Sequence, residues 1–430
     1  MNGQSKSVGG YSSVPVDWDI VPLAKVVFFQ EGPGLRKWQW TDSGMKVINV
    51  TNILGDGQID TANTRRFISM EEFTKTYSHF SVNDGDIVIA SSGNTYGKTG
   101  RISAKDLPLM MNTSVIRFHS GNAQLLSDDF LYAFLRSEFF RNQVESFVTG
   151  SAQPNFGPSH LKQMVMPLPP LRTQRRIASI LSAYDELIEN NQRRIRILED
   201  MARSLYREWF VHFRYPGYES IPLVDSPFGP IPQGWEVKTV ADSFKIIGGG
   251  TPARKEPEYW DDGTIQWFSP SDLTGAGTMF MDDSGERISE RGLAKSSARL
   301  FPARSVMLTS RATIGAIAIN SNEACTNQGF ITCLPNERVS LYFLYHWLKE
   351  NVPIFQRMAS GATFKEISRG VFKMIEFLQP MDELVRRFEN SVTPMADQVL
   401  ALQRQTANLR CTRDLLLPRL LSGQVNFEES

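Results

Sequence analysis

The sequence predicts an α+β fold in which two similar α/β domains are each followed by a long helix. Two observations support this class: an ordered internal repeat that starts again about half a chain later, and heptad-spaced apolar residues behind each copy. The chain has 430 residues, which is more than one hydrophobic core usually organises. Its 41% hydrophobic and 21% charged residues are ordinary for a folded protein. We therefore expect two domains, each with a core of its own.

The repeat is weak in identity but keeps its order along the chain. It opens with a Val/Ile-Pro-x-x-Trp phrase, at Val14 to Trp18 and again at Ile231 to Trp235. It closes with Leu-x-Pro and a pair of arginines, at Leu168 to Arg176 and at Leu378 to Arg387. The segments between these ends also match in the same order: Thr95-Tyr96-Gly97 with Thr313-Ile314-Gly315, Asn112 with Asn327, Phe130-Leu131-Tyr132 with Phe343-Leu344-Tyr345, and Gly150-Ser151-Ala152 with Gly361-Ala362-Thr363.

The first part of each copy is predicted to be a mixed α/β or β-rich domain. Its short β-rich runs, such as Ile87 to Ala90 and Val306 to Thr309, are separated by glycine, proline and asparagine.

The second part of each copy is predicted to be a long helix with one apolar stripe. Behind the first domain the stripe has a gap at Arg194 and otherwise runs through Ile177, Ile180, Tyr184, Leu187, Asn191, Leu198, Met201 and Leu205. Behind the second it runs through Val385, Phe388, Val392, Met395, Val399, Leu402, Thr406, Leu409, Leu416 and Leu420.

We expect the two helices to pack against each other along these stripes, since the same pattern follows both domains. Asn191, Arg194 and Thr406 are polar positions that can set the register of such a pair. Pro394 is expected to bend or divide the second helix. The alternative is that each helix is an ordinary amphipathic helix packed on its own domain.

Composition excludes several classes of protein. Lysine plus arginine equals aspartate plus glutamate at 46 each, so any affinity for nucleic acid must come from local basic patches. The sequence has no long apolar stretch and no secretory signal, so we expect a cytoplasmic protein. Cys325, Cys333 and Cys411 lack paired C-x-x-C spacing and are interpreted as reduced thiols.

The sequence contains no convincing catalytic or metal-binding motif. Ser92 to Thr99 approaches a phosphate-binding P-loop, but a serine replaces the first glycine and a proline-broken, turn-like segment follows. The second copy of this loop has no lysine. Gly248-Gly249-Gly250 lacks dinucleotide-site spacing, and the five histidines are scattered. Two functions stay open on these motifs alone: a coiled-coil scaffold that assembles partner proteins without binding nucleic acid, and a P-loop NTPase that uses Lys98.

Several phrases together resemble the DNA specificity (S, HsdS) subunit of Type I restriction-modification enzymes. They are the Pro-x-x-Trp openings at Trp18 and Trp235, and Gly249-Gly250-Thr251-Pro252 with Tyr259-Trp260 and Trp267. The others are Leu168-Pro169-Pro170-Leu171 before Arg175-Arg176-Ile177, Leu205-Tyr206-x-x-Trp209-Phe210, and the closing Leu416-Leu417-Pro418-x-Leu420-Leu421-Ser422-Gly423. The resemblance covers nearly the whole chain.

The resemblance implies two α/β target recognition domains separated by two long antiparallel coiled-coil-like helices, with an internal pseudo-twofold repeat. We expect a flexible N-terminus at 1–13, recognition domains at 14–171 and 215–380, helical spacers at 172–214 and 381–424, and a tail at 425–430. Each domain would read one half of a bipartite, asymmetric target in double-stranded DNA.

The resemblance also implies which partners the chain has. Two methylation subunits would dock on the helical regions, and restriction and translocation subunits would join the full complex in the cytoplasm of a bacterium or archaeon. The chain would have no catalytic site, metal or cofactor of its own. S-adenosylmethionine, ATP and Mg²⁺ would belong to the partner subunits.

Candidate DNA contacts are polar or basic residues on predicted loops, because cations meet phosphates and polar side chains read base edges. In the first domain they are Arg36, Lys37, Arg65, Arg66, Ser91, Ser92, Asn94, Lys98, Gln153 and Asn155. In the second they are Arg254, Lys255, Ser310, Arg311, Thr313 and Lys365. The repeated Ser/Arg/Thr turn is the preferred reader. Trp18 and Trp235 are expected to anchor the cores instead.

Overall fold

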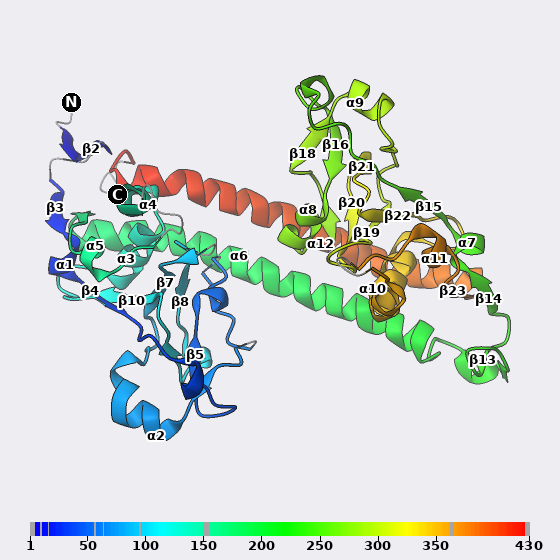
Figure 1. The fold of residues 1–430 in the computed structure, drawn as a ribbon, viewed down its shortest axis with the longest axis horizontal. Helices are drawn as coiled ribbons and strands as arrows, with labels where there is room; N and C mark the ends of the chain where they lie inside the picture. Colours follow the sequence, from blue (N-terminus) through cyan, green and yellow to red (C-terminus); the bar gives the residue numbers. More distant parts are fainter. Residues whose placement is uncertain are drawn as a thin grey trace. The chain divides into compact units, whose positions relative to one another are not determined.

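The computed structural model describes residues 5–8, 11–15, 17–55, 57–62, 64–93, 96–148, 155–361 and 365–425. The chain divides into two compact units, Met1–Ile188 with Asn408–Ser430 and Glu189–Ala407. Two long helices, α6 (Leu171–Tyr206) and α12 (Asp382–Leu421), each begin in one unit and end in the other (Figure 1).

The first unit is built on a four-stranded antiparallel sheet, in the order β4 (Val27–Glu31), β10 (Val115–Ser120), β7 (Ile87–Ala90) and β8 (Thr99–Arg101). The β7 sequence Ile-Val-Ile-Ala is rich in β-branched residues and is buried throughout, as a central strand requires. The remaining strands are β1 (Ser5–Val8) with β2 (Tyr11–Pro15), β3 (Asp19–Pro22) with β11 (Val165–Leu168), and β6 (Phe67–Ile68), β5 (Met45–Ile48) and β9 (Met110–Met111) in one small sheet.

Short helices pack with the main sheet around the core of this unit. They are α1 (Leu23–Val26), α3 (Asp128–Leu135), α4 (Glu138–Val148) and α5 (Pro158–Leu161), whereas the short helix α2 (Met70–Glu72) has no buried residue. Phe118 of β10 packs in the same core as Phe130 and Phe134 of α3, together with Trp18. Trp18 is 4% exposed, which agrees with its expected role as a core anchor.

The second unit has the same plan with one strand added. Its main sheet has the order β15 (Lys245–Gly248), β22 (Phe330–Leu334), β19 (Val306–Thr309), β20 (Ile317–Asn320) and β17 (Phe280–Met281). A smaller sheet contains β18 (Glu286–Ile288), β16 (Ile265–Phe268) and β21 (Ala324–Thr326). Two strand pairs complete it, β14 (Glu236–Thr239) with β23 (Glu376–Gln379) and β12 (Leu223–Val224) with β13 (Ile231–Pro232).

The helices of the second unit lie around an aromatic core. They are α7 (Val240–Ser243), α8 (Pro270–Ala276), α9 (Glu290–Ala294), α10 (Leu341–Met358) and α11 (Arg369–Lys373). Trp235, Phe343 of α10 and Phe388 of α12 are all buried in this core. Trp235 thus serves as the second expected core anchor.

The strand order confirms the internal repeat. In both main sheets the hydrogen-bonded neighbours come in the same order: first a strand from early in the domain, then a strand from late in the domain, then the two strands of a hairpin. These orders are β4-β10-β7-β8 and β15-β22-β19-β20. The first strand pair of the repeat also recurs, because β3 pairs with β11 before α6 and β14 pairs with β23 before α12. The fold is therefore α+β with two related domains, as the sequence predicts.

The helices α6 and α12 run antiparallel to each other. In the second unit Asn191 Nδ2 donates to Gln405 Oε1 over 3.1 Å. In the first unit Asp185 pairs with Arg413 at 2.6 Å, and Ile177 shares a core with Leu420. Residue numbers thus fall along α12 as they rise along α6.

The apolar stripe of α6 differs from the predicted one at alternate positions. It runs through Ile177, Leu181, Tyr184, Ile188, Asn191, Ile195, Leu198, Ala202 and Leu205, all buried or half-buried. The predicted positions Leu187 and Met201 are 51% and 49% exposed. Apolar neighbours stand side by side at these points, so periodicity alone did not identify the buried one. The step from Asn191 to Ile195 removes the apparent gap at Arg194, which is exposed.

The stripe of α12 follows the predicted positions, but Pro394 does not divide the helix. Val385, Phe388, Val392 and Val399 are at most 1% exposed. The helix continues without interruption from Asp382 to Leu421. Val392 and Ala396, on either side of the proline, are buried, and this packing holds the helix together where the proline lacks an N–H donor.

No helix in the described ranges is long and apolar enough to cross a membrane.

Candidate nucleic-acid interface

The segment Ser92 to Thr99, which approaches a P-loop in sequence, connects the two strands of a β-hairpin. Gly97 N donates to Ala90 O over 2.8 Å, and Ala90 N donates to Lys98 O over 3.0 Å, which closes the turn between β7 and β8. Gly97 has φ +80°, a conformation that glycine adopts without strain. A strand follows the turn instead of a helix, so Lys98 does not lie beside a helix N-terminus that could cradle a phosphate.

The second unit has an equivalent turn between β19 and β20. Gly315 N donates to Thr309 O over 3.1 Å, and Thr309 N donates to Ala316 O over 2.9 Å. Gly315 has φ +105°, so the glycine shared by the two copies again occupies a position with positive φ in the turn. The two units therefore present the same polar hairpin.

The serines at the start of both hairpins are buried. Ser91 is 0% exposed and Ser310 is 2% exposed. Their backbones have equivalent partners: Ser91 N donates to Ser114 O and Ser310 N donates to Gly329 O, each over 2.8 Å. Neither side chain is exposed enough in this structure to contact a base, and we leave both serines out of the DNA contacts that we propose.

In each unit the hairpin turn pairs with the loop that lies just before a short helix near the end of the domain, α5 in the first unit and α11 in the second. Ser92 forms a bridge with Asn155, and Arg311 forms one with Glu366. Asn155 is exposed, whereas Ser92 and Arg311 are half-buried. Thr313 and Lys365 are exposed beside the second turn, where Ala312 N donates to Lys365 O over 3.3 Å. Asn94 and Gln153 lie outside the described residues.

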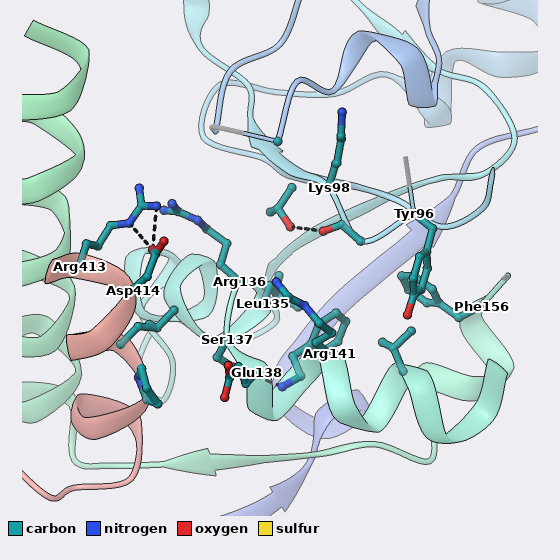
Figure 2. Close-up of a pocket in the computed structure, with 17 residues that line it drawn as sticks. Tyr96, Lys98, Leu135, Arg136, Ser137, Glu138, Arg141, Phe156, Arg413 and Asp414 are labelled. Atoms are coloured by element: carbon teal, nitrogen blue, oxygen red, sulfur yellow. Dashed lines mark hydrogen bonds and ion pairs between the residues drawn. The ribbon is translucent and has the colours of Figure 1, made fainter. Parts of the chain in front are cut away.

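A cleft with a volume of about 550 Å³ lies beside the first hairpin. Arg141 of α4 and Arg413 and Asp414 of α12 line it, and Lys98 borders it from the hairpin with its side chain extending away from these residues in Figure 2. Arg136 lines the cleft as well, immediately after α3. The cleft thus gathers four cationic side chains from separate parts of the first unit.

Two of these cations are neutralised by carboxylates. Asp185 on α6 lies 2.7 Å from Arg136 and 2.6 Å from Arg413, and Arg413 also lies 2.8 Å from Asp414. Within the described part of the chain, Lys98 and Arg141 form no ion pair. These two are therefore the cations of the cleft that have no carboxylate partner.

A second group of cations lies around the turn before β5. Arg36, Lys37, Arg65 and Arg66 are all exposed. The Arg66 guanidinium lies 5.2 Å from the ring centre of Trp40, and its Nη1 donates to Asn49 Oδ1 over 3.2 Å. This geometry leaves all four side chains open to a polyanion.

Arg254 in the second unit is engaged in the fold. Its guanidinium donates to both carboxylate oxygens of Glu286 and lies 3.8 Å from the ring centre of Trp260. The hydrogen bonds from Arg254 lower the pKa of the Glu286 carboxyl. This contact fixes β18 against the preceding loop, so we leave Arg254 out of the proposed set. Its neighbour Lys255 is exposed.

Sequence reasoning did not identify Arg136, Arg141 or Arg413 as members of the cleft. They lie on or next to the helices α3, α4 and α12, where a basic residue is usually a solvated surface group. Arg413 reaches Asp185 across 228 positions of sequence. A local pattern cannot indicate such a contact.

No cluster of three or more histidine, cysteine, aspartate or glutamate side chains that could hold a metal ion is present among the residues searched, which are those the structure describes.

Comparison with known proteins identifies the family. The model of the Type I restriction modification DNA specificity domain matches residues 15–200 and 232–383. The specificity subunit of the Type I restriction enzyme HindI from Haemophilus influenzae is 25% identical over 71% of this chain and 79% of its own length. A putative Type I restriction enzyme specificity subunit of Methanocaldococcus jannaschii, MjaX, is 21% identical over 96% of this chain and 95% of its own length.

A solved structure shows the same fold. The S subunit of a Type I restriction-modification system from M. genitalium superposes with a TM-score of 0.57 at 17% identity, covering 96% of this chain and 98% of that one. The family model covers most of the chain, in two segments that correspond to the two repeats. The chain therefore belongs to the Type I restriction-modification DNA specificity family: it is the DNA specificity subunit of such a system, and catalysis lies on other subunits.

Proposed function

We propose that this subunit reads a bipartite, asymmetric DNA target, one half with residues 14–171 and the other with residues 215–380. The observation that supports this most is the recurrence of the same polar hairpin in both units, between β7 and β8 and between β19 and β20. A single chain then imitates a dimer that reads two half-sites. The two copies differ in sequence, so the two halves would differ as well.

The proposed base readers are the polar side chains on and beside the hairpins. In the first unit they are Ser92 and Asn155; in the second they are Arg311, Thr313 and Lys365. Lys98, Arg141 and Lys255 would meet phosphates, and so would the exposed group formed by Arg36, Lys37, Arg65 and Arg66.

The helical regions 172–214 and 381–424 are proposed to hold the two halves at a fixed spacing and to dock two methylation subunits. Apolar side chains on the outer faces of the helices support the docking role: Leu187, Ile197 and Met201 on α6 and Leu415 on α12 are 49% to 63% exposed. S-adenosylmethionine, ATP and Mg²⁺ would act on the partner subunits, and restriction and translocation subunits would join the same assembly.

The test uses one variant in each unit. Arg311→Ala should reduce base discrimination at one half-site by about 1–3 kcal/mol, roughly 5- to 150-fold in relative Kd, and leave the other half unchanged. Asn155→Ala should do the same at the opposite half. Kd is measured for the assembled complex on duplexes altered in one half at a time. Equal losses at both halves for either variant would contradict the assignment of one unit to one half.

A further inference from the structure

Trp38 has the most exposed large apolar side chain in the described part of the chain, at 79%. An indole buries 150–250 Å² when it is covered, so leaving one in water forgoes a large hydrophobic gain. Trp38 lies on the 3₁₀ turn Lys37–Gln39, between β4 and β5. Trp38 is thus a large apolar side chain that its own unit leaves uncovered.

The turn holds Trp38 outward on a fixed support. The next residue, Gln39, is buried; its Oε1 accepts from Arg36 N over 2.7 Å, and its Nε2 donates to Tyr77 Oη over 3.0 Å and to the Glu72 carboxylate. Beyond it, Thr41 N donates to Phe67 O over 2.9 Å. Both flanks of the turn are thus tied to the unit. Exposure of Trp38 is consequently a property of an ordered segment.

Four exposed basic residues lie on the turn that carries Trp38 and on the neighbouring segment. Arg36 and Lys37 precede Trp38 directly, and Arg65 and Arg66 lie on the segment that leads into β6, the strand whose Phe67 bonds to Thr41. In the described residues none of these four cations forms an ion pair. Glu72, the carboxylate tied to this turn, is engaged by Gln39. An exposed indole on the same surface segment as unpaired cations suits duplex DNA, whose phosphates bind cations and whose thymine methyl groups and base steps accept apolar side chains.

We propose that Trp38 packs against the bases of one DNA half-site, while Arg36, Lys37 and Arg65 contact the flanking phosphates. The inference rests on the proposed function, since it adds a specificity-determining contact to the first reading domain. The contact is apolar, and therefore differs in kind from the polar readers at the hairpins. Removal of the indole should weaken binding without changing the number of neutralised phosphates.

The experiment uses the full complex with its methylation subunits and a duplex that carries the site found by methylation mapping. Trp38→Ala should raise Kd at least tenfold and lower base discrimination in one half only. Trp38→Phe should restore part of the affinity. Phe228→Ala is the matched control, because Phe228 is an aromatic of the second unit that is 50% exposed and follows Asp225 and Ser226.

Salt dependence distinguishes the indole from the cations around it. The slope of log Kd against log salt concentration should be unchanged in Trp38→Ala. It should fall by about 0.9 in Arg36→Ala, which removes one phosphate contact. An altered slope in Trp38→Ala would overturn the assignment of Trp38 to bases.

The outcomes separate this inference from the function on which it rests. If the unmodified complex discriminates both half-sites and Trp38→Ala behaves as Phe228→Ala does, the inference is overturned and the proposed function stands. If the unmodified complex discriminates neither half, both fail. If Trp38→Ala prevents assembly with the methylation subunits but leaves DNA binding of the assembled fraction unchanged, the surface meets protein and the inference is overturned. An unchanged unfolding midpoint is expected in every case, since the side chain is exposed.

Discussion

Replacing Ile188 with alanine tests the register of the helix pair, because Ile188 and its neighbour Leu187 have opposite exposures. Ile188 is 6% exposed and Leu187 is 51% exposed. Removing three buried carbons costs about 2.4 kcal/mol of transfer free energy, and the cavity left behind adds to it. The better helix propensity of alanine returns about 0.4 kcal/mol. We expect Ile188→Ala to destabilise the chain by about 3 kcal/mol.

Leu187→Ala is the matched control. About half of its side chain is already in water and no cavity forms, so the expected loss is at most about 1 kcal/mol. Thermal unfolding followed by circular dichroism measures both. For a unit of about 200 residues, the midpoint should fall by about 6–12 °C in Ile188→Ala and by at most about 4 °C in Leu187→Ala. An equal or larger loss in Leu187→Ala would refute the observed register and favour the stripe first predicted from the sequence.

Three further predictions concern other parts of the molecule. Burial lowers the pKa of His346 from 6.5 to about 3. Between these two pH values only the unfolded chain protonates the imidazole. The free energy of unfolding is therefore unaffected by His346 above pH 6.5 and decreases as the pH falls towards 3. At pH 5 the loss is about 2 kcal/mol, and His346→Asn should show a correspondingly smaller drop between pH 7.5 and pH 5 in urea titrations; an identical drop would contradict the buried neutral state. In thiol labelling of the native chain only Cys411 should react, because Cys325 and Cys333 are buried and burial raises the pKa of Cys325 to about 12; rapid labelling of all three would count against the core. Adding four residues to each long helix lengthens it by about 6 Å and should increase the spacing between half-sites by one to two base pairs, read from methylated sites; unchanged spacing would contradict the ruler role.

The sequence predicted the repeat and its polar turns because their requirements are local. Gly97 and Gly315 have positive φ in equivalent turns, a conformation that favours glycine, so the same residue type can be recognised at this position in both copies. The same holds for Trp18 and Trp235, which are buried near the start of each domain. Short-range chemistry of this kind can be recognised without a structure.

The structure differs from the sequence expectation where a distant partner decides the outcome. Ser91 resembled an exposed loop residue, but it is buried, and its carbonyl accepts from Phe156 N over 3.1 Å from far along the chain. Arg254 resembled a free cation, yet Glu286 accepts from it across 32 residues. The choice between Leu187 and Ile188 likewise depends on the partner helix. No periodicity in one segment carries that information.

The most direct test of the central claim is to map methylated bases in cells that express this chain together with its methylation subunits. The account predicts two short, different sequence blocks separated by a gap of fixed length in which any base is accepted. A substitution such as Arg311→Ala should then relax one block and leave the gap and the other block unchanged. A single continuous recognition sequence, or two blocks relaxed together, would contradict the account.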